Sequence, residues 1–190
     1  MKKHTFRTLV FVGIASIVAV ACSKKNSTPT PTPINNLPQT LTVKPGRAKN
    51  GGFSISTPYG FIANINFNGT DDSTIQGDIY KYGSTVGDSI KLNFSYGIGY
   101  GGLVSADTIA ARTYYANMGN TVLSVEKFST DNFNPVVLVS YLENKEFRMN
   151  LSAFNSVAGK HNLNIYSQYA NREDQKALIK SMMITVKYIP

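Results

Sequence analysis

Few side chains in this sequence can do catalytic chemistry. The 190 residues include two histidines, His4 and His161, and a single cysteine, Cys22. A Ser-His-Asp triad or a multi-histidine metal site in the main part of the chain would depend on His161 alone. His161 stands in GKHNLN, where a turn leads into a strand, and we interpret it as solvated or structural. The sequence therefore predicts no catalytic residues, no metal site and no cofactor.

Oxygen-bearing side chains gather in the stretch NFNGTDDSTIQGD. They are Asn68, Thr70, Asp71, Asp72 and Asp78. Carboxylate and amide oxygens are the ligands that calcium prefers, but this spacing matches no EF-hand loop. Asn-Gly and Asp are also the usual residues of hairpin turns. We interpret the stretch as a turn, with an ion site as the alternative.

The stretch GIGYGG matches the pattern G-x-G-x-x-G at Gly97, Gly99 and Gly102. In a dinucleotide-binding fold these glycines would let a pyrophosphate approach a helix N-terminus, and Glu126 would hold the ribose. Here the strand alternation continues through the motif, and the repeating strand-helix-strand pattern does not follow it. We interpret the glycines as a strand end or a bulge.

Tyrosine is abundant, with 11 residues, and the chain has no Trp. Six tyrosines could line a pocket or a sugar-stacking surface, because each combines an apolar ring with a hydrogen-bonding hydroxyl. They are Tyr80, Tyr82, Tyr96, Tyr100, Tyr114 and Tyr115. Without Trp, however, Tyr and Phe must fill the core of a sheet protein. We favour core packing, and the sequence leaves the ligand-binding residues unknown.

Short alternating runs from Leu41 onward predict the elements that position these side chains. The clearest is SIKLNFSYGIGY, in which apolar and polar residues alternate as in a strand with one buried face. FIANINF predicts another strand, with apolar and polar side chains on opposite faces: Phe61, Ala63, Ile65 and Phe67 on one, Asn64 and Asn66 on the other. PVVLVSYL and EFRMNLSAF, separated by ENK, suit a hairpin. We expect about eight or nine strands in all.

The C-terminal stretch NREDQKALIKSMM predicts a helix, with Asn171 as its N-cap and Glu173 and Asp174 in its first turn. Its apolar face would carry Leu178, Ile179, Met182 and Met183. ITVKYI follows as a last strand. Residues 41–190 are therefore predicted to form one α+β domain, mainly antiparallel β-sheet with a C-terminal helix and a last strand. The alternative is a closed, lipocalin-like β-barrel.

The first 21 residues have the pattern of a signal peptide. Three basic residues precede an apolar run, Leu9 to Ala21, which is shorter than the about 20 apolar residues of a membrane-spanning helix. Exported proteins usually pair their structural cysteines, and Cys22 has no second cysteine to pair with. The predicted cleavage site lies between Ala21 and Cys22.

The sequence AVAC resembles the lipobox of bacterial lipoproteins, with Ala19 where that family usually has Leu. The resemblance implies that lipid is attached to the Cys22 sulfur, so that the mature chain is anchored to a membrane. Residues 22–40 are polar and rich in proline and threonine. Such a composition cannot form a core, and we interpret the segment as an extended tether.

The whole layout resembles small exported lipoproteins of Gram-negative bacteria from an uncharacterised family. The shared features are the lipobox, the Pro/Thr tether, the stretch LNFSYGIGYGG and the closing LNIYS…LIKSMMITVKY. The last of these is also similar to the end of PsbP-like domains. Ser23 replaces the aspartate that retains some lipoproteins in the inner membrane. The resemblance thus implies the outer membrane, with the domain facing the periplasm or, as the alternative, the cell surface.

The formal charge of +8 does not predict a nucleic-acid partner. Five of the 19 basic residues precede Leu41, which leaves 14 against all 11 acidic residues, without a basic run. We interpret the protein as a non-enzymatic binding or assembly module for an envelope protein, a polysaccharide or a small apolar ligand. The alternative is an envelope hydrolase or isomerase with a carboxylate-based site.

Overall fold

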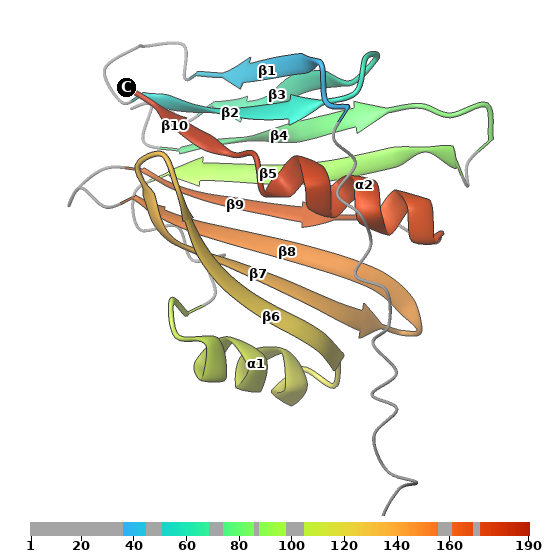
Figure 1. Ribbon diagram of the computed structural model, residues 1–190, viewed down its shortest axis with the longest axis vertical. Coiled ribbons are helices and arrows are strands. Elements are labelled where there is room, and N and C mark those ends of the chain that lie inside the picture. The colour runs from blue at the N-terminus through green and yellow to red at the C-terminus, as the bar shows by residue number, and fades with distance from the viewer. Residues whose placement is uncertain are drawn as a thin grey trace, which may run out of the picture. The chain divides into compact units, whose positions relative to one another are not determined.

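The computed structural model describes residues 36–44, 51–68, 74–85, 88–97, 105–155, 161–168 and 172–190. The predicted signal peptide, with Ala21 and Cys22, and most of the predicted tether lie outside these ranges. The described residues form ten strands and two helices (Figure 1). In chain order these are β1 (Gln39–Val43), β2 (Gly52–Thr57), β3 (Ile62–Asn68), β4 (Thr74–Lys81), β5 (Ile90–Gly97), α1 (Thr108–Asn117), β6 (Thr121–Thr130), β7 (Phe133–Glu143), β8 (Glu146–Asn155), β9 (Asn162–Ser167), α2 (Glu173–Met183) and β10 (Lys187–Ile189).

Seven strands form one antiparallel sheet in the order β3-β4-β5-β9-β8-β7-β6. The predicted hairpin of β7 and β8 forms, because Asn144 and Lys145 adopt the positive φ angles of 51° and 68° that a two-residue hairpin turn needs. In the described part of the chain the sheet is open, with β3 and β6 at its edges. The predicted antiparallel α+β fold is confirmed, and the alternative closed barrel is not formed.

A second antiparallel sheet has the order β1-β2-β10 and joins both ends of the domain. The main core lies between this sheet and one face of the larger one (Figure 1). Phe53 of β2 is fully buried there, with its ring centroid 5.2 Å from that of Phe94 and 6.0 Å from that of Tyr96, both on β5. The small sheet thus covers the inner face of β4 and β5.

Helix α2 covers the same inner face of the large sheet (Figure 1). The predicted apolar face is confirmed, because Ile179, Met182 and Met183 are fully buried and Leu178 packs against the core. The predicted N-cap is wrong. The position belongs to Arg172, which makes no side-chain cap bond; its guanidinium instead bonds both carboxylate oxygens of Asp174, at 3.1 and 3.0 Å.

Helix α1 covers the opposite face of the large sheet, over β6 and β7. The Asp107 side chain caps it by accepting a hydrogen bond from the Ala110 backbone N at 2.8 Å, which satisfies one of the unpaired donors of the first turn. Tyr115 is buried against Tyr141, with ring centroids 4.3 Å apart. Both faces of the β7 end of the sheet are therefore covered.

Strand β3 is exposed along most of its length. Phe61 is buried, but Ile62 to Asn66 are all exposed, Ile65 among them. The register with β4 keeps Ile65 opposite Gly77, and the pairing becomes irregular only between Ile65 and Phe67. Ile65 is therefore exposed because β3 is the edge strand of the sheet, not because its alternation of faces is broken.

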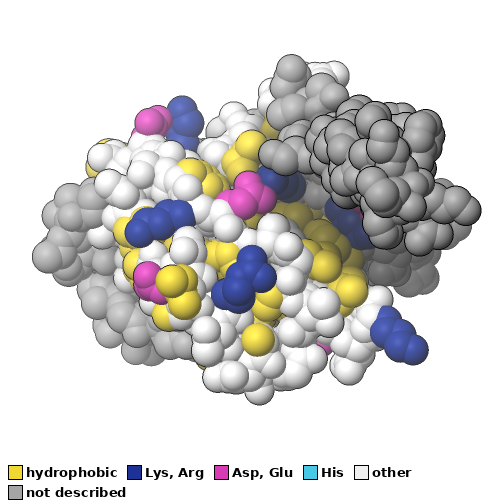
Figure 2. All heavy atoms as spheres, turned by 60° about the horizontal axis from the view of Figure 1, so that its bottom comes forward, with side chains coloured by type: hydrophobic (Ala, Val, Ile, Leu, Met, Phe, Trp, Pro, Cys, Tyr) yellow, Lys and Arg dark blue, Asp and Glu magenta, His cyan; other side chains and the backbone are white. Residues whose placement is uncertain are grey.

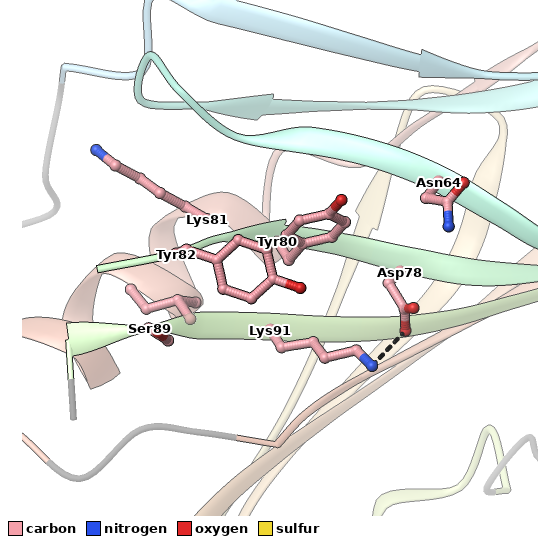
Figure 3. A pocket seen from close by; sticks show the side chains of 8 residues that line it. Asn64, Asp78, Tyr80, Lys81, Tyr82, Ser89 and Lys91 are labelled. Atoms are coloured by element: carbon pink, nitrogen blue, oxygen red, sulfur yellow. Dashed lines mark ion pairs between the residues drawn. The ribbon is translucent and has the colours of Figure 1, made fainter. Parts of the chain in front are cut away.

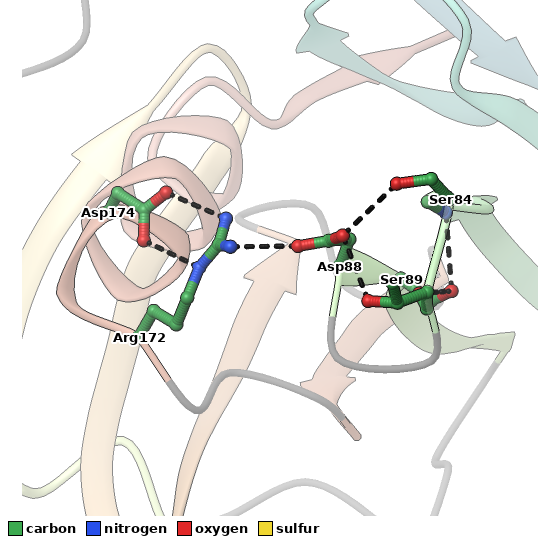
Figure 4. A network of polar contacts seen from close by, with 7 residues as sticks. Ser84, Asp88, Ser89, Arg172 and Asp174 are labelled. Atoms are coloured by element: carbon green, nitrogen blue, oxygen red, sulfur yellow. Dashed lines mark hydrogen bonds and ion pairs between the residues drawn. The ribbon is translucent and has the colours of Figure 1, made fainter.

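The connection between β4 and β5 is attached to the start of α2 by a surface ion-pair network (Figure 4). Arg172 Nη1 lies 2.7 Å from Asp88 Oδ1, and Asp88 also accepts hydrogen bonds from Thr85 and Ser84. The hydrogen bond from Thr85, and then the charge of Arg172, lower the pKa of Asp88 below its ordinary value of 3.8.

Because of this network, the free energy of unfolding is expected to decrease as the pH is lowered into the acid range. Because the pKa of Asp88 is lower in the folded chain, its ionised form stabilises the fold above about pH 4, and that contribution is lost as the pH falls through the folded pKa. We expect Asp88→Asn to lower the urea midpoint at pH 7 slightly, since the groups are exposed, and to leave it unchanged relative to wild type near pH 2. Urea titrations at both pH values test this; an equal deficit at both would contradict it.

Candidate functional site

The outer face of β4 and β5 carries polar, half-buried side chains. In β4, buried Ile75 and Ile79 alternate with half-buried Gln76, Asp78 and Tyr80. In β5 (Ile90–Gly97), the alternation predicted from the sequence is confirmed as far as Tyr96. The buried Leu92, Phe94 and Tyr96 alternate there with half-buried Lys91, Asn93 and Ser95.

A pocket of about 300 Å³ opens on this face at the ends of β4 and β5. Its lining includes Asn64, Asp78, Tyr80, Tyr82, Ser89 and Lys91. The rings of Tyr80 and Tyr82 lie side by side, with centroids 4.9 Å apart and planes inclined by 59°. Figure 3 shows both rings beside the pair formed by Asp78 and Lys91, while Lys81 points away from them. The pocket thus combines aromatic faces with amide, carboxylate and ammonium groups.

The charges of the pocket largely neutralise each other. Lys91 Nζ lies 3.2 Å from Asp78 Oδ1, and the Asp78 side chain is only 13% exposed. Asn66 Nδ2 donates to Asp78 Oδ2 at 2.6 Å, and Asn64 Nδ2 donates to Asn66 Oδ1 at 2.6 Å. A mostly buried carboxylate needs such partners. Among the described lining residues Asp78 is the single carboxylate, so this pocket does not bring together the two acids that a glycosidase uses.

The six candidate tyrosines divide between core and surface. Tyr96 is fully buried, and Tyr115 is nearly so; burial raises the pKa of both hydroxyls. Core packing is confirmed for these two. Tyr80 and Tyr82 line the pocket instead, and Tyr82 is 79% exposed. Tyr114 is exposed on α1 and Tyr100 lies outside the described residues.

His161 is a structural histidine. It is 1% exposed and its ring stacks on Tyr96 with centroids 4.9 Å apart. The solvated alternative is wrong, because the strand start that holds it packs into the core.

The motifs that suggested an ion or a dinucleotide are only partly described. Thr70, Asp71, Asp72, Gly99 and Gly102 lie outside the described residues. Asp78 pairs with Lys91, and Glu126 pairs with Lys180 of α2 at 2.6 Å. The described ranges contain no cluster of three or more His, Cys, Asp or Glu side chains that could hold a metal ion. Neither of their helices is long and apolar enough to cross a membrane.

A second exposed surface lies around α1, where Ile109, Tyr114 and Met118 reach solvent. Figure 2 shows the molecule from this side: hydrophobic side chains emerge in small groups between basic and acidic side chains that stand singly. Exposed apolar side chains are normal on protein surfaces.

The polar partners of Tyr80 and Tyr82 were not predicted from the sequence. Their signal was present in the strand periodicity, because Asn64 and Asn66, like Lys91 and Asn93, occupy alternate positions. The pairing of β3 with β4 and of β4 with β5, which the sequence does not state, places these residues beside the tyrosines.

Comparisons with known proteins identify no family. No family model matches the chain, and no curated protein matches it. Among solved structures the chain is similar to LpqN, described as involved in cell envelope biogenesis of Mycobacterium tuberculosis. The identity is 12%, the match covers 80% of this chain and 91% of that chain, and the TM-score is 0.43. A likeness of this size shows neither the family nor the ligand of this chain.

Proposed function

We propose that the protein is a lipid-anchored binding module of the cell envelope and that it binds its ligand in the Tyr80–Tyr82 pocket. The observation that supports this most is Tyr82, which presents an aromatic ring to solvent beside a second ring and a set of convergent polar groups. Binding sites combine apolar contact surface with a few placed polar groups in this way. The single, ion-paired carboxylate favours binding over acid–base catalysis.

The anchor is proposed to be Cys22, attached to the outer membrane with the domain in the periplasm. The sequence supports this with the basic start, the short apolar run and the lone cysteine after Ala21. About 0.8 kcal/mol per buried methylene makes several acyl chains a lasting anchor. The proline-rich residues that follow would hold the domain clear of the lipid headgroups.

Replacing Cys22 with serine tests the anchor. We expect Cys22→Ser to abolish lipid labelling and partitioning into detergent, and to leave uncleaved precursor, because the predicted cleavage needs the lipidated cysteine. The wild-type chain should partition into detergent, and protease should digest the domain only after the outer membrane is opened. A Cys22→Ser chain that is cleaved and still partitions into detergent would contradict the anchor; digestion in intact cells would place the domain outside.

The binding role is tested by retention on purified envelope material. Detergent-solubilised full chain should sediment with the material, and Tyr82→Ala should remain largely in the supernatant, because it removes the exposed ring without opening the core. Tyr114→Ala is the matched control, since it removes an exposed tyrosine on α1, away from the pocket. Equal retention of all three chains would contradict the pocket as the binding site.

A further inference from the structure

We propose that the ligand is a neutral oligosaccharide chain that begins in the Tyr80–Tyr82 pocket and continues across the outer face of the large sheet to Tyr166 of β9. This inference rests on the proposed function and adds to it the chemical class and the path of the ligand. The path of the ligand is inferred from the register of the strands, not from the pocket alone.

The register places a row of polar side chains that begins in the pocket and extends beyond it. Asn64 of β3 is opposite Asp78 of β4, Asp78 is opposite Asn93 of β5, and Asn93 is opposite Tyr166 of β9. Directly opposite residues of antiparallel strands point to the same face, so these side chains form one row, here called the polar row. All four are at least partly exposed. The row therefore leads from the pocket to the middle of the sheet.

Aromatic rings lie at both ends of this path. Tyr80 and Tyr82 stand at the pocket, and Tyr166 stands at the far end, where Gln168 Nε2 donates to its hydroxyl at 3.3 Å. Between them the row offers amide groups. Sugars present both apolar C–H faces and a dense set of hydroxyls, which rings and amides respectively can contact.

Asn93 adds a separate observation at the centre of the row. Its Nδ2 is buried and has no hydrogen-bond partner within the described part of the chain. A buried donor without a partner is costly. A ligand hydroxyl or a water held under the ligand would satisfy it, whereas an apolar ligand would not.

The charge pattern favours a neutral ligand. Asp78 and Lys91 pair with each other at 3.2 Å, so neither charge is left to select an ion. The second lysine of the pocket, Lys81, points away and donates to the Tyr59 carbonyl at 3.3 Å. Binding should therefore depend little on salt, unlike binding between exposed opposite charges.

The spacing of the row fits a chain molecule. Neighbouring strands lie about 4.8 Å apart, which is close to the length that one pyranose unit adds to a polysaccharide. Tyr80 of β4 and Tyr166 of β9 are two strand spacings apart across the sheet, roughly 10 Å, and two residues apart along the strands, roughly 7 Å. A trisaccharide or a slightly longer chain would contact both aromatic ends, and a disaccharide would contact one.

The experiment is calorimetric titration of the full chain, solubilised in a detergent without a sugar headgroup, with gluco-, manno- and chito-oligosaccharide series from disaccharide to hexasaccharide. We expect affinity to rise with length and to level off once the chain reaches Tyr166. Tyr82→Ala should weaken binding at least about tenfold for every length, or about 1.4 kcal/mol. Tyr166→Ala should weaken the longer ligands and leave the disaccharide unchanged, and Tyr114→Ala should bind like wild type. Circular dichroism checks that each variant is folded.

The outcomes separate the two proposals. Length-dependent binding that follows this variant pattern supports the inference. A second outcome is that Tyr82→Ala loses retention on envelope material but the wild-type chain binds no oligosaccharide. The pocket then remains the binding site, and the sugar ligand is overturned in favour of a protein. Binding that weakens strongly with added salt overturns the neutral ligand in favour of an anionic one. If Tyr82→Ala changes neither retention nor titration, both proposals fail.

Discussion

Replacing Phe53 with alanine is expected to lower the free energy of unfolding by about 3–5 kcal/mol. Phe53 is fully buried and is the aromatic contact between the small sheet and Phe94 and Tyr96 of the large one. Its loss opens a cavity that the two sheets cannot close without moving relative to each other. Small domains are stable by only about 5–15 kcal/mol, so the variant should unfold at a much lower urea concentration, measured by circular dichroism on the detergent-solubilised chain.

Two controls sharpen this prediction. Phe53→Leu keeps most of the volume and should cost less than about 1.5 kcal/mol. Tyr59→Ala removes an aromatic ring from the turn after β2, but that ring is 71% exposed, so its effect should stay within about 0.5 kcal/mol. Similar urea midpoints for Phe53→Ala and Tyr59→Ala would contradict the assigned core.

Replacing Gly77 with alanine is expected to cost about 3 kcal/mol, although it adds one methyl group. Gly77 lies on the inner face of β4, and the ring of Phe94 lies across it. A Cβ at this position would overlap the backbone oxygen of Asn64 and the ring of Phe94. The ring can move, but the Asn64 oxygen belongs to the neighbouring strand, so β3 must shift and the pocket residue Asn64 shifts with it. We expect a lower urea midpoint and weaker ligand binding together.

Gly119 provides the contrast for this substitution. It has a φ of +82°, and a methyl group added there would meet no other atom within 4 Å. Gly119→Ala should therefore cost only the backbone strain, about 1–2 kcal/mol, and leave binding unchanged. Combining Gly77→Ala with Phe94→Leu should recover part of the loss, because it relieves one of the two overlaps. Full recovery would show that the Asn64 oxygen is not a barrier.

The parts of the fold that were predicted correctly depend on local periodicity. The alternation of β5 and the apolar face of α2 follow from side chains that are near one another in sequence. The N-cap of α2 was missed because Arg172 is held by charges, one of them on Asp88, which lies far away in the chain. The exposure of Ile65 in β3 was not predicted, because the position of a strand at the sheet edge is a property of the sheet, not of the strand alone.

The candidate site shows the same division. The alternation of side chains along a strand assigns Tyr96 to the core, because it is on the same face as Leu92 and Phe94. The same alternation assigns Tyr80 to the surface, because it is on the face opposite to Ile75 and Ile79. This alternation within one strand does not indicate which strands are neighbours in the sheet. The polar row needs β9 beside β5, a pairing between segments separated by α1 and three other strands, and no local pattern in the sequence indicates it.

The place of β9 also sets the order in which the molecule can assemble. β3-β4-β5 and β6-β7-β8-β9 are two meanders of consecutive strands, and the pairing of β9 with β5 joins them. Nearly all of the chain must emerge before this late strand can join the halves, and β10 must follow to complete the small sheet. Such non-local pairing slows folding. For an exported chain such as the one proposed here, slow folding is an advantage, because the polypeptide stays unfolded while it crosses the membrane. The same delay carries a risk. Until β9 pairs with β5, each half of the sheet exposes an unpaired strand edge, which chaperones must protect from aggregation.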